Sequence, residues 1–330
     1  MSFKKKFTTI ALLGTATAAT IHIINKAIEY SATLYNYLAQ PEGNYYDWRF
    51  GKIFYTKQGE GSPILLIHDL DVSSSSYEWN AVVSTLSKIN TVYTLDLLGC
   101  GRSDKPNLTY TNFLYVQLIT DFIKHIIKEK TDVISTGASG SFTIMACAND
   151  NDIFNKIMLV NPASLIELAK IPTKRTKMLK HIINLPIIGT LIYNITVAKN
   201  MIEENFEENY FYDNSKIDSK AIDTYYEAAH NKAMASKFLF ASIQSRYTNA
   251  NIIHCLKNIN NSIFIITGNG NPLNEAFADQ YANQIPAIEV FGIENTKYLP
   301  QLEAPTAFIE QVDVLFELSI KTCDKEEISA

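Results

Sequence analysis

Cysteine is scarce in this 330-residue chain, and its placement excludes two common ways of stabilising a domain. The four cysteines lie far apart and form no C-x-x-C pair: Cys100, Cys147, Cys255 and Cys323. That spacing argues against a disulfide framework and against a zinc site. We therefore expect free, mostly buried thiols and no bound metal, and the sequence implies no organic cofactor.

Positive charge is also in short supply. The chain has 29 Lys and Arg against 34 Asp and Glu, a net charge of −5, so no overall positive field would attract a nucleic acid partner. Hydrophobic residues make up 47% of the chain, which excludes wholesale disorder. At roughly 100 to 200 residues per domain, the length fits one large domain or two.

The N-terminus has the layout of a membrane anchor or signal sequence. Three lysines, at positions 4 to 6, precede a largely apolar stretch over residues 7–24, and Asn25 restores polarity. That stretch is close to the ~20 residues that a bilayer needs, but threonines dilute it. We expect membrane association through residues 7–25, with a cleaved signal ending at Ala16-Thr17-Ala18 or a helix packed on the protein as alternatives.

If this segment spans a membrane, the lysines before it would keep the N-terminus in the cytoplasm and place the globular part outside. A cytoplasmic protein is the alternative localisation.

The rest of the chain alternates short β-branched runs with helical patterns, which is typical of a mostly parallel sheet flanked by helices. Strands are predicted at residues 52–57, 63–69, 91–97, 131–137, 156–161, 262–268 and 287–292. Amphipathic helices are predicted at residues 75–88, 112–128, 139–148, 274–284 and 304–318.

A long helical insert interrupts this pattern after the sixth strand. Between residues 163 and 255 no strand is predicted, whereas helical periodicity is strong. Such an insert would form a lid over the edge of the sheet where ligands bind. We therefore predict an N-terminal helix and linker (1–43), an α/β core (44–162 and 256–330) and a helical cap (163–255).

One segment between a predicted strand and helix carries a candidate nucleophile. Gly137-Ala138-Ser139-Gly140-Ser141 fits the G-x-S-x-G pattern, except that serine replaces the last glycine. Such a turn needs small neighbours, so that the serine can project above the sheet at a helix N-terminus. The alternative is a serine that caps a helix.

Two further segments agree with the first interpretation, and together the three resemble the α/β-hydrolase fold family with a helical cap. The run from Leu65 to Leu70, which contains His68 and Asp69, resembles the family's His-Gly loop. The run from Asp96 to Asp104 resembles its D-x-x-G-x-G-x-S motif. The resemblance covers residues 45–318 and implies an α/β-hydrolase fold.

The same resemblance implies where an oxyanion would bind. The backbone N–H groups of Leu70 and Gly140 would face it, with Ser139 as nucleophile and His68 and Asp69 in the supporting loop. Asp69 stands where the family has glycine, and it would add negative charge close to where negative charge develops.

The other two members of a catalytic triad are missing from their usual places. Asn271 occupies the acid position and Tyr298 the histidine position, while Asn161 occupies the second placement of the acid. A tyrosine with a pKa of about 10 is a poor general base near neutral pH. The chain has six histidines, and none follows His254.

Two hypotheses about function remain open at this point. The first is a carboxylesterase-like serine hydrolase that acts on an ester or similar acyl substrate in an apolar pocket under the cap. It needs an unrecognised base, and the candidates are His68, His181, His230 and His254. The second is a catalytically inactive binding or scaffold protein that retains the fold and the pocket. In both, we expect a small hydrophobic acyl or ester ligand.

Overall fold

A central sheet organises the computed structural model, which describes residues 3–318, with only the backbone described for residues 3–14, 16 and 234. The eight strands are β1 (Asn44–Trp48), β2 (Gly51–Gln58), β3 (Ser62–Ile67), β4 (Asn90–Leu95), β5 (Thr131–Thr136), β6 (Phe154–Val160), β7 (Ile263–Gly268) and β8 (Glu289–Ile293). Their spatial order is β1-β2-β4-β3-β5-β6-β7-β8. Strands β3 to β8 pair in parallel, whereas β1 and β2 are antiparallel to their neighbours.

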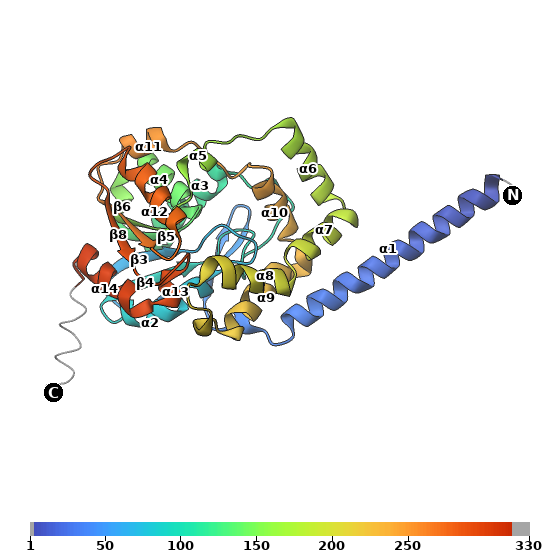
Figure 1. Ribbon diagram of the computed structural model, residues 1–330, viewed down its shortest axis with the longest axis horizontal. Helices are drawn as coiled ribbons and strands as arrows, with labels where there is room; N and C mark the ends of the chain where they lie inside the picture. Colours follow the sequence, from blue (N-terminus) through green and yellow to red (C-terminus); the bar gives the residue numbers. More distant parts are fainter. Residues whose placement is uncertain (1–2, 319–330) are drawn as a thin grey trace.

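Helices cover both faces of this sheet (Figure 1). One face packs on α3 (Asn112–Phe122), α4 (Ser139–Asn149) and α12 (Pro272–Ala282), and the other on α2 (Asn80–Leu86) and α14 (Pro305–Phe316). Within β3, Leu65 and Ile67 enter the first core, and Ile64 and Leu66 enter the second. The predicted mostly parallel, helix-flanked sheet is confirmed.

The sequence pattern missed one strand, β1. Its side chains are mostly exposed at the edge of the sheet, so β1 lacks the alternation of apolar and polar residues that marks a half-buried strand. The other seven strands fall within a few residues of the predicted ranges.

Helices fill the chain between β6 and β7, as the sequence predicts: α5 (Leu165–Leu168), α6 (Lys174–Asn184), α7 (Ile188–Thr196), α8 (Lys199–Asn205), α9 (Ser219–Met234), α10 (Lys237–Gln244) and α11 (Ile253–Lys257). Part of this insert shares a hydrophobic cluster with the core: Phe206, Phe211 and Tyr225 pack together with Leu299. These aromatic side chains therefore pack the insert together and hold it against the core. The domain limits given above remain a prediction.

Helix α1 (Phe3–Thr33) extends away from the rest of the molecule (Figure 1). Its C-terminal part packs on the insert, where the Asn194 side chain donates to Asn25 Oδ1 (2.7 Å) and the Ala233 N–H donates to Glu29 Oε1 (2.7 Å). Among the described residues, no single helix has both the length and the hydropathy of a membrane span; one pair bent by 100°, Lys174–Asn184 with Ile188–Tyr210, passes by length and composition. Cys323 lies outside the described residues.

Candidate active site

The turn between β5 and α4 lies at the centre of the sheet's carboxyl edge. Its left-handed residue is Gly137, with φ of +56°, a conformation that glycine adopts at little cost. A Cβ at this position would lie 2.1 Å from Tyr298 Oη and 2.4 Å from Asp69 Oδ1. Residue 137 thus stands at the apex of this turn between β5 and α4, which we call the elbow. Only glycine fits there between these two side chains.

Ser139 lies two residues beyond the apex, as the first residue of α4. Its side chain is fully buried, and its Oγ donates to the His68 carbonyl oxygen (2.7 Å). The structure therefore does not bring the predicted nucleophile to the surface of the site. The pattern in register with the turn is Ser135-Thr136-Gly137-Ala138-Ser139, whose central residue has no side chain.

Two backbone N–H groups converge beside this apex. The Leu70 N–H (2.8 Å) and the Ala138 N–H (2.9 Å) both donate to Asp69 Oδ1. Leu70 is placed as predicted, but Gly140 is not, because its N–H points back toward the Gly137 carbonyl oxygen (3.3 Å). In this fold the two oxyanion donors come from the residue after the nucleophile position and from the loop after β3, which describes Ala138 and Leu70. The Asp69 carboxylate therefore lies where an oxyanion would bind to these two donors.

The second oxygen of Asp69 is held as well. Tyr298 Oη donates to Asp69 Oδ2 (2.8 Å), and the Tyr298 ring stacks on Tyr210 with 5.5 Å between ring centroids. Desolvation raises the pKa of Asp69 to about 6, although these hydrogen bonds lower it in part. Burial and the nearby Asp69 charge raise the pKa of Tyr298 far above its usual range. Tyr298 is therefore a hydrogen-bond donor here and not a base.

A second acid, Glu78, lies beneath the elbow and was not predicted from the sequence. Its Oε2 accepts the Asp69 N–H (3.2 Å) and its Oε1 accepts from Gln301 Nε2 (3.0 Å). Burial, followed by the charge of Asp69, raises the pKa of Glu78 to about 8. No local signal marks this residue, because its burial depends on Gln301, which lies more than 200 residues away in sequence.

His68 has a structural role, as the resemblance implied. Its Nε2 accepts the Leu97 N–H (3.0 Å), so the proton resides on Nδ1, which donates to the Asp69 carbonyl oxygen (2.7 Å). Burial lowers the pKa of His68, which favours this neutral form. His68 thus ties the loop after β3 to the end of β4.

The remaining candidate bases have partners or places elsewhere. His230 Nδ1 lies 2.9 Å from the Tyr226 carbonyl oxygen, and burial lowers its pKa to about 4. His254 on α11 has its Nε2 3.1 Å from Nδ2 of Asn258, the residue that follows this helix. His181 is exposed on α6.

Both acid positions hold amides that perform structural work. Asn271 caps α12, since its Oδ1 accepts the Leu273 N–H (3.1 Å). Asn161 Nδ2 donates to the carbonyl oxygens of Lys297 (3.0 Å) and Tyr298 (2.8 Å). A carboxylate has no hydrogen to donate to two carbonyls, so asparagine at 161 is suited to holding the Tyr298 loop.

A cavity of about 460 Å³ lies above the elbow, against the insert. Its lining mixes apolar side chains, including Leu273 and Phe277, with acids and with five asparagines: Asn161, Asn205, Asn209, Asn271 and Asn274. Asp69 and Asp71 also line it. The predicted apolar pocket is therefore a mixed one. Within residues 3–318, no group of three or more His, Cys, Asp or Glu side chains is placed to hold a metal ion.

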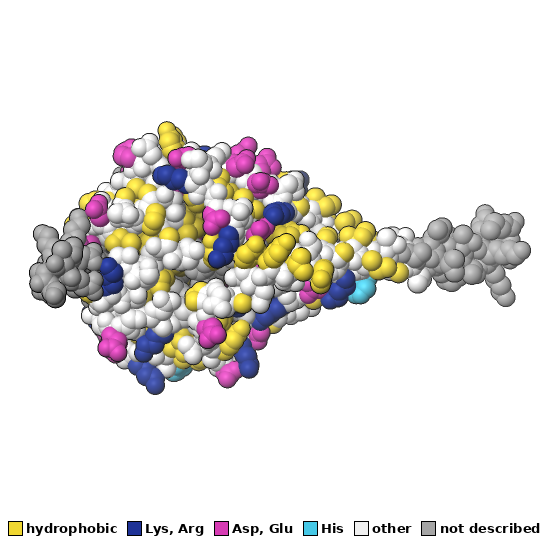
Figure 2. Space-filling model, turned by 90° about the horizontal axis from the view of Figure 1, so that it is seen from below, with side chains coloured by type: hydrophobic (Ala, Val, Ile, Leu, Met, Phe, Trp, Pro, Cys, Tyr) yellow, Lys and Arg dark blue, Asp and Glu magenta, His cyan; other side chains and the backbone are white. Residues whose placement is uncertain are grey.

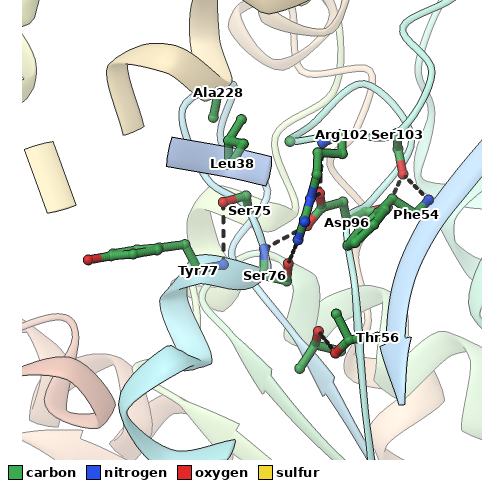
Figure 3. Close-up of polar contacts among 12 residues, drawn as sticks. Leu38, Phe54, Thr56, Ser75, Ser76, Tyr77, Asp96, Arg102, Ser103 and Ala228 are labelled. Atoms are coloured by element: carbon green, nitrogen blue, oxygen red, sulfur yellow. Dashed lines mark hydrogen bonds and ion pairs between the residues drawn. The ribbon is translucent and has the colours of Figure 1, made fainter. Parts of the chain in front are cut away.

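The second resembling motif is structural (Figure 3). The Asp96 carboxylate accepts the N–H groups of Ser76 and Arg102 (both 2.7 Å), and Ser103 Oγ donates to the Asp96 carbonyl oxygen (2.6 Å). Ser103 Oγ also accepts the Phe54 N–H (2.8 Å). This network fastens the loop after β4 to β2 and positions the loop that follows Asp69.

A comparison with known families agrees with the fold. A model described as the alpha/beta hydrolase family matches residues 64–311, and the chain belongs to that family. Among curated proteins, 2-hydroxy-6-oxo-6-(2'-aminophenyl)hexa-2,4-dienoic acid hydrolase of Metapseudomonas resinovorans is 26% identical over 114 residues, which are 34% of this chain and 39% of that protein. The chain thus spans 39% or less of the curated relatives that it first matches.

Solved structures are similar over more of the chain. A serine hydrolase involved in carbazole degradation has a TM-score of 0.68 and 17% identity, and covers 84% of this chain and 99% of its own. A membrane phospholipase A has a TM-score of 0.66 and 15% identity, and covers 97% of this chain and 99% of its own. At these identities they show a shared fold alone.

Proposed function

We propose that this chain is a catalytically inactive member of the alpha/beta hydrolase family that binds a small neutral ligand in the cavity above Gly137. The observation that carries the proposal is the position of Asp69, whose Oδ1 accepts both N–H groups that would stabilise an oxyanion. Those donors can lower a reaction barrier only if they are free to receive the charge that develops on the substrate.

The other groups around the elbow support the same conclusion. Position 137 has no side chain to attack a substrate. Tyr298 keeps its proton and donates a hydrogen bond to Asp69. An ionised Asp69 would also repel a developing oxyanion at the same place. Losing nucleophile activation alone costs a factor of about 10⁴ to 10⁶ in rate.

A second candidate function is a carboxylesterase-like serine hydrolase with Ser139 as nucleophile. Membership of a family rich in hydrolases favours it. It would require Ser139 Oγ to leave the His68 carbonyl and α4 to unwind by a turn, because the serine is fully buried. The cost of that opening makes it the weaker candidate.

A covalent probe distinguishes the two candidates. Incubating the full chain with a fluorophosphonate probe, which labels activated serines, should give no labelling. The matched control carries Asp69→Gly, Gly137→Ser, Asn271→Asp and Tyr298→His, which together supply the missing groups. Labelling of the unmodified chain that disappears in Ser139→Ala would overturn the proposal. Hydrolysis of p-nitrophenyl butyrate by the same three proteins provides the second measurement.

The cavity's chemistry defines the ligand class. Asp69 and Asp71 disfavour an anion, the asparagine amides offer donors and acceptors, and Leu273 and Phe277 can contact a short apolar chain. Neutral acyl compounds such as amides and esters fit this combination. Butyramide should therefore raise the melting temperature of the chain, whereas butyrate at the same concentration should not.

A variant that fills the cavity tests whether binding occurs there. Leu273→Trp places a bulky ring on the lining, while Val314→Trp adds the same ring on α14, which lies outside it. The butyramide shift should disappear in the first variant and persist in the second. If neither compound shifts the melting temperature, the binding half of the proposal fails even when the chain is inactive.

We also propose that α1 attaches the protein to a membrane. The apolar residues 7–24 lie on a helix that extends from the rest of the molecule, and only its C-terminal part packs on the insert (Figure 1). The full chain should float with lipid vesicles in a density gradient, and replacement of three apolar residues of this stretch by aspartate should abolish flotation. Flotation that is unaffected by those substitutions would contradict the proposal.

A further inference from the structure

Helix α7 is apolar on two opposite faces. Its inner face is buried against α10 and α1, where Tyr193 and Val197 are almost inaccessible. Its outer face carries Ile188, Leu191 and Ile195, which are 55%, 43% and 63% exposed. These three residues follow an i, i+3, i+7 spacing, so they form one continuous stripe on the helix. A soluble surface helix normally keeps its outer face polar.

Further apolar side chains extend this stripe over the neighbouring turn and helix. The exposed residues of the set are Met178 and Leu179 on α6, and Leu185 and Ile187 in the turn. We call α6, α7 and the turn between them the α6–α7 face. Hydrophobic side chains gather on the part of the surface that narrows toward α1 (Figure 2). Exposed apolar surface of this extent marks a site of interaction.

The α6–α7 face lies in a basic part of the chain, whereas the rest of the chain is acidic. Residues 170–202 contain six lysines and arginines and no acidic residue, which leaves 23 basic and 34 acidic residues for the remainder of the chain. Within the described residues, Lys174, Arg175 and Lys177 are exposed and take part in no ion pair. An apolar surface bordered by unpaired cations complements a bilayer that contains anionic lipids.

Helix α1 places this face at the right level for such a bilayer. Asn25, which follows the apolar stretch, accepts a hydrogen bond from Asn194 on the inner face of α7. Any membrane that takes up residues 7–24 therefore begins beside α7. Ile23 and Ile24 of α1 are also exposed, 68% and 48%, and continue the apolar surface.

We infer that the α6–α7 face lies in the interface of an anionic membrane, with Ile188, Leu191 and Ile195 among the acyl chains and Lys174, Arg175 and Lys177 at the headgroups. This inference rests on the proposed attachment through α1. The insert would then be held against the lipid surface by two contacts, α1 and the α6–α7 face, so the cavity would open close to the membrane.

Quenching by brominated lipid tests this arrangement on the full chain. The two native tryptophans are buried, Trp48 at 6% and Trp79 at 0% exposed, so a new surface tryptophan reports its own surroundings. Ile188→Trp reports the α6–α7 face. Val314→Trp on α14 is the control, because Val314 is at least as exposed (67% against 55%) and α14 lies at the opposite end of the molecule from α1 (Figure 1).

In vesicles of brominated phosphatidylcholine and phosphatidylglycerol, quenching of Ile188→Trp should exceed that of Val314→Trp by about threefold or more, since interfacial helices bury their apolar face 5–10 Å deep. Adding Lys174→Glu and Lys177→Glu to Ile188→Trp should reduce the quenching, whereas Lys257→Glu on α11 should not. Vesicles without the anionic lipid should also give weaker quenching.

Equal quenching of the two tryptophans in protein that floats with the vesicles would overturn this inference while leaving the α1 attachment standing. Protein that does not float and shows no quenching would overturn both. If the aspartate substitutions in residues 7–24 change neither flotation nor the quenching of Ile188→Trp, the α6–α7 face binds lipid without α1, which overturns the α1 attachment and with it the arrangement in which two contacts hold the insert.

Discussion

The elbow after β5 and the outer face of α7 differ in whether their groups have partners within the protein. At the elbow, the two N–H groups that a substrate would need are bonded to Asp69, and Asp69 is bonded to Tyr298. On α7, Ile188, Leu191 and Ile195 face outward with no protein partner over much of their surface. The place where this family performs chemistry is closed internally, while an apolar helix face is left open.

This difference indicates where function should be sought. A closed hydrogen-bond network rigidifies a site and removes its reactive groups from use. An open apolar face gains free energy only when something covers it. The chain therefore shares the fold of the alpha/beta hydrolase family, and the difference between the two regions is what the proposed binding function requires.

The largest effect is expected when a side chain is forced into the elbow. Gly137→Ala puts a Cβ into a left-handed residue and against Tyr298 Oη, so it should destabilise the protein by about 2 to 5 kcal/mol. Gly140→Ala is the matched control, because the nearest atom to its Cβ would be the end of the Leu159 side chain at 3.1 Å. Urea unfolding of both variants makes the measurement.

Tyr298→Phe removes the oxygen that the new Cβ would meet, and should recover part of the loss in Gly137→Ala. Equal stabilities for Gly137→Ala and Gly140→Ala would contradict the proposed closure of the elbow.

Glu78 makes the closed site sensitive to pH. An unfolded Glu78 loses its proton near pH 4.5, but the folded protein holds that proton until about pH 8. Between these values the folded state binds more protons than the unfolded state, so stability falls as pH rises across this window. The loss should be on the order of a few kcal/mol.

Glu78→Gln removes this proton and should flatten the decline, which thermal unfolding from pH 5 to 9 can measure. The variant should match the native chain near pH 4.5 and exceed it above pH 8. Parallel curves for the two proteins would exclude Glu78 as the source.

Two substitutions of Asp69 distinguish whether the elbow needs a hydrogen-bond acceptor at this position or a negative charge. Asp69→Ala leaves the Leu70 and Ala138 N–H groups without their partner and should cost about 1 to 3 kcal/mol. Asp69→Asn keeps an oxygen between them and should recover most of that loss. Because the pKa of Asp69 is raised to about 6, the asparagine variant should gain relative to the native chain as pH rises from 4 through 6.

Guanidinium unfolding at pH 4.5 and 7.5 gives both comparisons. If Asp69→Ala and Asp69→Asn are equally stable, the two N–H groups do not depend on this acceptor.

The smallest effect is expected on the open face. Ile188→Ser should change the free energy of unfolding by less than about 0.5 kcal/mol, because the side chain is 55% exposed. Ile183→Ser, at a residue that is 1% exposed on the inner side of α6, should cost several times more. A large loss in Ile188→Ser would show that this face is part of the fold and not a surface kept for lipid.

Particular residues show how far the sequence could be interpreted. The period of apolar residues predicted seven strands and the helical insert, and Asn271 and Tyr298 were identified as departures from a triad. The elbow was misplaced by two residues, since both Gly137 and Ser139 are small and local sequence does not state which one takes the left-handed conformation. Gly140 was assigned to the oxyanion hole for the same reason, although the N–H that shares an acceptor with the Leu70 N–H belongs to Ala138.

Neighbouring residues alone record the alternation of strands and helices, the helix predicted at residues 274–284, and the basic segment 170–202, which contains no acidic residue. The state of the site, in contrast, depends on contacts between distant parts of the chain. The closure joins residue 69 to residues 138 and 298, and Glu78 to Gln301, which are far apart in the chain. A carboxylate's partners and its pKa depend on what the fold places around it, and no local pattern carries that information.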